Sequence, residues 1–209
     1  MKASNLINKL AIDGGIPVRD EMLPYGRQSL DKKDIEAVVD VLQSDWLTTG
    51  PKVGEFEAAF ADSVGVEEAV VVNSGTAALH AAMYAIGISS GDEVILPAIT
   101  FVATANCVLY QGGIPIFADV DPDTMLIDVT KIESKITSKT VAICLISPNN
   151  PTGAVFEENS LKKLIDIANE HDLYIICDEI YDQIVFDKKF VGIGKVAGDS
   201  PVILSLIHI

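Results

Sequence analysis

Residues 141–153 read Val-Ala-Ile-Cys-Leu-Ile-Ser-Pro-Asn-Asn-Pro-Thr-Gly, and residues 173–181 read Leu-Tyr-Ile-Ile-Cys-Asp-Glu-Ile-Tyr. Each stretch is a short apolar run that is followed at once by polar residues. Runs of this length and composition are typical of strands that are buried on both faces of a parallel sheet. Ligands bind beyond the carboxyl ends of such strands. The two stretches therefore predict two buried strands whose polar ends share one edge of a sheet.

The same alternation of strand and helix signals extends on both sides of these stretches. Alternation with short connections predicts an α/β fold, with a mostly parallel sheet and helices on both faces. Strands are expected over residues 69–72, 93–96, 114–118, 141–146, 173–177 and 202–204. Helices are expected over residues 31–44, 53–64, 74–86, 100–111, 128–136 and 157–171.

The first residues of the chain carry few regular signals. Gly14, Gly15, Pro17 and Pro24 interrupt residues 1–25, which we interpret as an N-terminal arm. Residues 26–209 are expected to form one large domain, since they contain no linker or low-complexity segment. The N-terminus lacks the apolar core of a signal peptide.

Composition excludes several classes of partner. Lys and Arg number 15 against 30 Asp and Glu, which gives a net charge of −15. This balance argues against nucleic acid or an anionic membrane as the main partner. The three cysteines lie in apolar runs without a Cys-x-x-Cys spacing, so we expect buried free thiols and a cytoplasmic protein. The three histidines show no spacing typical of a metal site, and no metal is expected.

One long uncharged stretch has the length of a membrane span. Residues 94–118 contain no charged side chain, and a helix of that length could cross a bilayer. Pro97, Gly112, Gly113 and Pro115 divide the stretch, however, because proline and glycine interrupt regular structure. We therefore expect a strand, a helix and a strand rather than a membrane helix.

The polar residues after the two opening strands suit one particular ligand. Asn150 supplies an amide, Asp178 a carboxylate and Tyr181 a phenol. A carboxylate at the end of a buried strand needs a partner, and a protonated pyridine nitrogen would be one. Asn150 and Tyr181 could reach a phenolic oxygen of the same ring. This set predicts pyridoxal 5′-phosphate. The alternatives are a plain Asn-Pro turn, a capping aspartate and a core tyrosine.

Two earlier segments add the remaining contacts for such a ligand. Ser74, Gly75 and Thr76 follow an apolar run and open a helix, where free backbone N–H groups and the helix dipole favour a phosphate. Serine and threonine are also ordinary N-caps, so this signal is weak alone. Phe101 follows Pro97 just beyond a strand end and could stack on an aromatic ring. The alternative for Phe101 is a core position that covers the sheet.

Taken together, these residues resemble the fold-type-I aminotransferases. Residues from about 10 to 140 resemble the DegT-type sugar aminotransferases, through 45–51, 73–81 and 97–106. Residues from about 141 to 205 resemble the class I amino-acid aminotransferases, through the two stretches quoted first. The join near Thr140 fits either one natural protein with both signatures or a chimera. The resemblance implies pyridoxal phosphate bound by the residues named above, and a homodimer in the full-length form.

The resemblance also implies a missing catalyst. In class I members, a strand like residues 201–205 leads into a Ser-Lys motif that bears the Schiff-base lysine. Here the chain reads Ser205-Leu-Ile-His-Ile and stops. We therefore expect a truncated large domain without its C-terminal small domain, and a chain that is inactive as given. Lys188, Lys189 and Lys195 lie in a polar stretch and are interpreted as surface residues.

The expected activity is amino transfer from a small-molecule donor to a keto acceptor. The first part of the chain favours a keto-sugar nucleotide with glutamate as donor, and the second part favours a 2-oxo acid. Two alternatives stay open: a sugar dehydratase or lyase that uses the same cofactor, and a non-catalytic fragment with an uncovered sheet edge. A dinucleotide-binding domain is disfavoured, because no Gly-x-Gly-x-x-Gly follows the early strands.

Overall fold

The computed structural model describes residues 9–22, 24 and 28–205, which fall into two compact units. The first unit extends to Pro51 and contains a short 3-10 turn, η2 (Ala11–Asp13), and helix α1 (Lys32–Gln43). Asp31 caps α1 by accepting from the Lys33 and Asp34 amides, and the Asp34 carboxylate accepts in return from the Asp31 amide at 2.8 Å. This reciprocal arrangement is a capping box and fixes where the expected helix begins.

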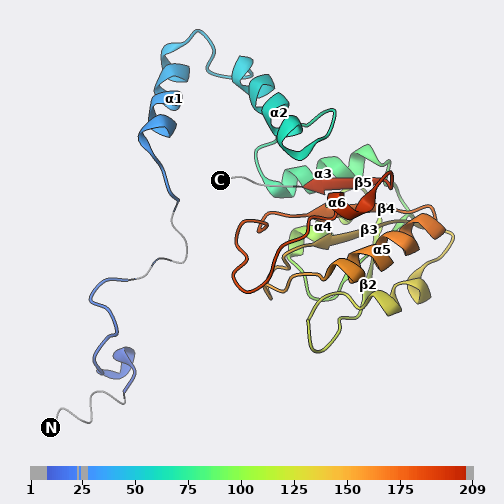
Figure 1. Ribbon diagram of the computed structural model, residues 1–209. Helices are drawn as coiled ribbons and strands as arrows, with labels where there is room; N and C mark the ends of the chain where they lie inside the picture. The colour runs from blue at the N-terminus through green and yellow to red at the C-terminus, as the bar shows by residue number, and fades with distance from the viewer. Residues whose placement is uncertain (1–8, 23, 25–27, 206–209) are drawn as a thin grey trace. The chain divides into compact units, whose positions relative to one another are not determined.

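The second unit, from Lys52 onward, is built on a five-stranded sheet (Figure 1). Its strands lie in the order β2-β1-β3-β4-β5, and every neighbouring pair is parallel. This confirms the predicted fold class. The strands are β1 (Glu93–Pro97), β2 (Ile114–Ala118), β3 (Thr140–Ile146), β4 (Tyr174–Asp178) and β5 (Val202–Ser205).

Helices cover both faces of the sheet, because side chains of each strand alternate between the faces. Val94, Leu96 and Cys144 pack with helices α3 and α4 in one buried cluster. Ile143 and Cys177 belong to a second cluster on the opposite face, with α5 and α6. The helices of this unit are α2 (Pro51–Val64), α3 (Gly75–Ala85), α4 (Val102–Tyr110), α5 (Glu158–Glu170) and α6 (Gly194–Ala197).

The uncharged stretch over residues 94–118 forms a strand, a helix and a strand, as the glycine and proline positions predict. Helix α4 at its centre is only nine residues long. Among the described residues, no helix has the length and apolar character that a membrane span requires. The three cysteines are free and buried, which also agrees with their apolar surroundings in the sequence.

Two expected elements differ from the structure. Residues 128–136 form two 3-10 turns, η3 (Val129–Lys131) and η4 (Glu133–Lys135), instead of one α-helix. The Asp128 side chain accepts from the amide and the hydroxyl of Thr130, and this local bonding starts a tight turn. The predicted helix over these residues was therefore wrong in type, although its place in the chain order was right.

The predicted strand over residues 69–72 is also wrong. This segment is not part of the sheet, and Val70 is 80% exposed. Its Val71 amide donates to the Glu57 side chain at 2.9 Å instead of to a neighbouring strand. The segment has the apolar composition of a strand, but a strand forms only where a neighbouring strand offers backbone hydrogen-bond partners.

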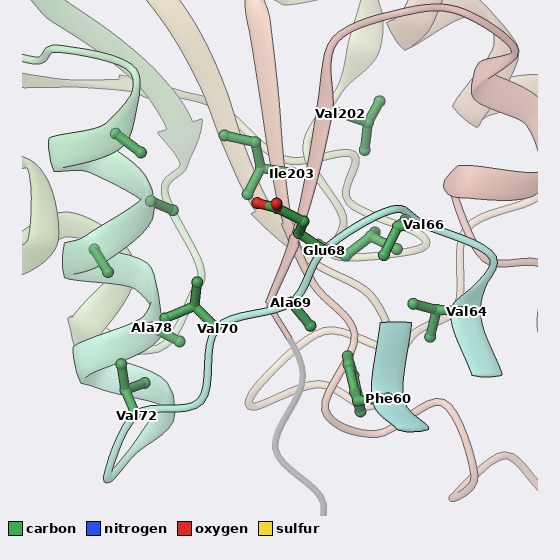
Figure 2. A pocket seen from close by; sticks show the side chains of 14 residues that line it. Phe60, Val64, Val66, Glu68, Ala69, Val70, Val72, Ala78, Val202 and Ile203 are labelled. Carbon is green, nitrogen blue, oxygen red and sulfur yellow. The ribbon is translucent and has the colours of Figure 1, made fainter. Parts of the chain in front are cut away.

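An apolar groove of about 400 Å³ lies between this segment and strand β5 (Figure 2). Strand β5 ends the sheet, so its outer backbone groups have no strand partner among the described residues. Side chains of α2, α3 and β5 complete the groove, and Glu68 is its one charged lining residue. An unpaired strand edge beside an apolar surface favours association with other chains.

We expect the chain to self-associate through this edge. Replacing Val70 with lysine should lower the association measured by analytical ultracentrifugation, because a charge on the groove wall opposes apolar contact. Val70 is exposed, so the free energy of unfolding should change by only about 0.5 kcal/mol. Ile184→Lys, at a residue that is 57% exposed and outside the groove lining, is the control. Equal association of the two variants would contradict this expectation.

Candidate functional site

The candidate site lies where three neighbouring strands end. β1, β3 and β4 are adjacent and parallel, so the segments that follow them leave the same edge of the sheet. These segments are residues 98–101, 147–153 and 179–181. The backbone ties the last two together, since the Ser147 amide donates to the Asp178 carbonyl at 2.9 Å. The sheet thus gathers the polar residues that the sequence places after separate strands.

Asn150 and Tyr181 are in direct contact. The Asn150 amide nitrogen donates to the Tyr181 hydroxyl oxygen at 3.2 Å, across 31 residues of sequence. Both side chains are half-buried, so each has one side toward protein and one toward solvent. Asn150 lies in a turn that Gly153 closes in a left-handed conformation, with φ of 72°. The amide and the phenol can therefore donate to one anionic oxygen placed beside them.

Asp178 is a buried carboxylate without a cation. It is 6% exposed, and its Oδ1 accepts from the Ile180 amide at 3.3 Å. None of the ion pairs in the described part of the chain involves it. Burial raises the pKa of the Asp178 carboxyl to about 6, partly offset by the Ile180 amide. A cation delivered to this carboxylate would relieve its desolvation.

The side of the sheet on which Asp178 lies follows from strand alternation. Ile176 packs in the cluster with α3 and α4, while Cys177 packs in the cluster with α5. Asp178 is two residues beyond Ile176, so it faces the α3 and α4 side. The N-termini of these two helices carry Ser74 and Phe101. Asp178 and the two helix N-termini therefore belong to the same layer of the fold.

Ser74, Gly75 and Thr76 form the N-terminus of α3. The Ser74 hydroxyl accepts from the Ala77 amide at 3.2 Å, which is ordinary N-capping. The first amides of a helix have no partner within the helix, and Gly75 and Thr76 supply two of them. Seven residues separate the end of α3 from β1, and β1 begins at the opposite edge of the sheet. An 11-residue helix of about 16 Å brings its N-terminus back to the site edge.

Phe101 is not a core residue. It is the N-cap of α4, its side chain makes no capping bond, and it is 44% exposed. This exposure argues against the alternative of a phenylalanine that only covers the sheet. An exposed ring at the carboxyl end of β1 is free to stack on a ligand.

Sequence reasoning missed two buried residues, each adjacent to a residue that it selected. Asn149 is 2% exposed and donates to the Ile99 carbonyl at 3.2 Å. Glu179 is 5% exposed and accepts from the Ile193 amide at 2.7 Å. Burial raises the pKa of the Glu179 carboxyl, and the Ile193 bond opposes that shift. A run of two polar residues at a buried strand end was the available signal, because both must find partners.

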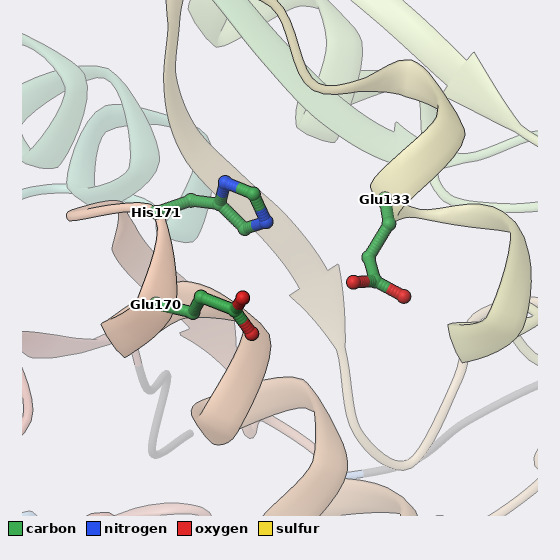
Figure 3. Close-up of side chains that lie close together, drawn as sticks. All are labelled: Glu133, Glu170 and His171. Atoms are coloured by element: carbon green, nitrogen blue, oxygen red, sulfur yellow. The ribbon is translucent and has the colours of Figure 1, made fainter.

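One group of possible metal ligands lies elsewhere. Glu133, Glu170 and His171 place ligand atoms within 4.8 Å of one another, although their sequence spacing did not suggest a site (Figure 3). All three residues are exposed. Glu170 and His171 end α5 just before β4 begins, at the edge opposite the candidate site. This group is therefore separate from the residues described above.

Comparison with protein families gives one match that covers most of the chain. The model of the DegT/DnrJ/EryC1/StrS aminotransferase family matches residues 28–179. The match therefore crosses Thr140 and includes Ser74, Phe101, Asn150 and Asp178.

Individual relatives agree with this match. The spore coat polysaccharide biosynthesis protein SpsC of Bacillus subtilis is 39% identical over 160 residues, which are 77% of this chain and 40% of that protein. The UDP-4-amino-4-deoxy-L-arabinose–oxoglutarate aminotransferase of Shewanella sediminis is 40% identical over 159 residues, 76% of this chain and 39% of that protein. The chain thus spans about two fifths of the length of these relatives.

Solved structures of aminotransferases share the fold. An Escherichia coli aminotransferase superposes with a TM-score of 0.74 and 28% identity, covering 87% of this chain and 47% of that one. Thermus thermophilus aspartate aminotransferase with maleate superposes with a TM-score of 0.73 and 29% identity, and the match covers 81% of this chain and 47% of that one. The aminotransferase TlmJ of Streptoalloteichus hindustanus superposes with a TM-score of 0.62 and 31% identity, and the match covers 72% of this chain and 40% of that one.

The raised pKa of Asp178 predicts how stability depends on pH. The carboxyl holds its proton more tightly in the folded chain than in the unfolded one, where its pKa is near 3.8. The associated stability is complete below about pH 4 and is lost as pH rises through about 6. Asp178→Asn should therefore be more stable than the wild type by about 1–3 kcal/mol near pH 8.

The difference should vanish well below pH 3.8, where the carboxyl is largely protonated in both the unfolded and the folded chain. Urea unfolding of both proteins at several pH values measures it. The burial of Glu179 is common to both proteins, but the part of its raised pKa that the Asp178 charge causes is absent from the variant, which adds to the variant's stability in the same direction. A wild type that is the more stable protein near pH 8 would show that Asp178 is not a destabilising buried charge.

Proposed function

The chain belongs to the DegT/DnrJ/EryC1/StrS aminotransferase family, and on that premise we propose that it forms the cofactor-binding part of an aminotransferase that uses pyridoxal phosphate. The observation that carries this proposal is the buried, unpaired Asp178 beside the Asn150–Tyr181 hydrogen bond. A carboxylate and two donors at one sheet edge match the charges around a protonated pyridine ring with an anionic oxygen. In this proposal, the cofactor-binding domain comprises residues 26–209, and the N-terminal arm of residues 1–25 precedes it.

The residues of this chain fit the cofactor as follows. Asp178 would hold the protonated ring nitrogen, and that ion pair would lower the pKa that burial raises. Asn150 and Tyr181 would donate to the ring oxygen, while Phe101 would stack against the ring. The amides of Gly75 and Thr76 with the Ser74 and Thr76 hydroxyls would bind the phosphate. When bound, pyridoxal phosphate supplies an electron sink for negative charge on the substrate carbon.

The proposed reaction moves an amino group from a small-molecule donor, with glutamate as the expected one, to the carbonyl carbon of an acceptor. A keto-sugar nucleotide is the favoured acceptor. The family match supports it, as do two relatives whose names refer to polysaccharide biosynthesis and to an amino-arabinose nucleotide. A 2-oxo acid is the second candidate. The Asn150–Tyr181 pair and the likeness to aspartate aminotransferase support it.

We propose that the active form is a homodimer in the cytoplasm. The family match supports the homodimer, and three buried free thiols support a reducing compartment. Since the chain spans about two fifths of the length of its relatives, we propose that it does not catalyse the reaction alone.

Turnover by a protein of the relatives' length that contains this chain tests the reaction. With glutamate and pyridoxal phosphate, we expect amination of a UDP-4-keto sugar to be at least about tenfold faster than amination of a 2-oxo acid, a difference of about 1.4 kcal/mol. The 209-residue chain should give no steady turnover. The reverse preference would assign the 2-oxo acid, while dehydration or side-chain cleavage without amino transfer would overturn the proposed reaction.

Ser74→Asp separates phosphate binding from helix capping. Aspartate is a good N-cap, so the stability of α3 should persist, while its carboxylate should repel a phosphate. Pyridoxamine 5′-phosphate is a suitable probe, since it cannot form a Schiff base with surface lysines. We expect the variant to bind this probe about tenfold or more weakly than the wild type, measured by probe fluorescence.

Pyridoxamine without the phosphate is the matched control ligand and should bind both proteins with the same weak affinity. Thermal unfolding of the variant checks that the cap is kept. Unchanged affinity for the phosphorylated probe would mean that Ser74 only caps α3.

A further inference from the structure

Two adjacent asparagines in the turn after β3 make different contacts. Asn150 presents its amide to Tyr181 and is half-buried, whereas Asn149 is 2% exposed and bonds only to the protein. A fully buried primary amide needs a donor and an acceptor partner at fixed places. The contacts of Asn149 therefore show what it holds together.

One set of contacts lies within the turn. The Asn149 side-chain oxygen accepts from the Thr152 hydroxyl at 3.0 Å and from the Thr152 amide at 3.4 Å. The Asn149 carbonyl accepts from the Gly153 amide at 2.8 Å, and the Asn149 amide donates to Ala154 at 2.9 Å. These bonds set the shape of residues 149–154, and with it the place of Asn150.

A further contact leaves the turn. The Asn149 side-chain nitrogen donates to the Ile99 carbonyl at 3.2 Å, across 50 residues of sequence. Ile99 lies two residues before Phe101, in the loop that follows β1. In the described part of the chain, this is the hydrogen bond that joins the loop over residues 98–101 to the turn over residues 147–153. The turn itself does not need this bond, because its internal contacts use the oxygen.

We propose that Asn149 is a positioning residue that locks the Phe101 loop to the Asn150–Tyr181 pair. This inference rests on the proposed function, because the ring of the cofactor would lie against Phe101 and beside Asn150. The Asn149 side chain then fixes the spacing between Phe101 and the Asn150–Tyr181 pair. A ring bound between them needs both at the same time, so loosening either loop weakens binding through the other.

Asn149→Asp is the most selective change. Aspartate has the same shape and keeps an oxygen for Thr152, but it has no N–H to give to Ile99 and turns a like charge toward that carbonyl. We expect affinity for pyridoxamine 5′-phosphate to fall about tenfold or more. Hydrogen exchange of the amides over residues 98–104 should become faster, while exchange over residues 149–154 should change little.

Two control variants separate positioning from local structure. Thr152→Val removes both bonds of the Thr152 hydroxyl inside the turn, to Asn149 and from the Ala154 amide, and leaves the Ile99 link, so it should weaken binding less than Asn149→Asp. Asn150→Ala should weaken binding of the probe without changing exchange over residues 98–104. If Asn149→Asp does not fold, Asn149→Ser carries the same expectation, because its hydroxyl can reach Thr152 but cannot span to Ile99.

The outcomes distinguish this inference from the function on which it rests. If the wild type binds the probe and Asn149→Asp binds it equally well, Asn149 is not a positioning residue. Equal losses in Asn149→Asp and Thr152→Val, with unchanged exchange over residues 98–104, would reduce Asn149 to a turn residue and also overturn the inference. If the wild type binds no probe, the proposed function itself fails.

Discussion

The parallel pairing of β3 with β4 is the constraint on which the rest of the second unit depends. Register pairs Ile146 with Asp178, so that both strands end at the same level. Side chains below that level alternate into two buried clusters, and both faces must be covered by helices. The residues that follow the strand ends include the polar Asn149, Asn150 and Tyr181. The pairing thus produces the core and the candidate site together, one on each side of the strand ends.

The same pairing explains why the site carries an electrostatic cost before any ligand binds. Asp178 ends a strand whose three preceding residues are apolar and buried, so its carboxylate is desolvated without a cation. The Asn150–Tyr181 pair beside it supplies donors, and Phe101 supplies an exposed ring. A flat ligand with a positive charge at one edge and an anionic oxygen at another would give these residues the partners that they lack in the free chain. This combination is common at functional sites, where stability is given up for binding.

How far the sequence predicts these features depends on whether the physical cause is local. The strands from Glu93 onward, the capped helix α1 and the convergence of Asn150 with Tyr181 follow from local composition and from the general rule for parallel sheets. Residues 69–72 failed because a strand also needs a partner, and pairing is not encoded in the segment itself. Asn149 was missed because its role lies in a hydrogen bond to Ile99, which only the folded chain brings within reach.

The pKa of the Asp178 carboxyl, followed by carbon-13 NMR in the presence and absence of pyridoxamine 5′-phosphate, tests the central claim most directly. In the free chain, the pKa should lie at about 6, because the carboxyl is buried without a cation. With the probe bound, the pKa should fall well below its usual value, since a protonated pyridine nitrogen then stabilises the charged form. A pKa that stays at about 6 with the probe bound would contradict the account, because Asp178 would then not hold the ring nitrogen.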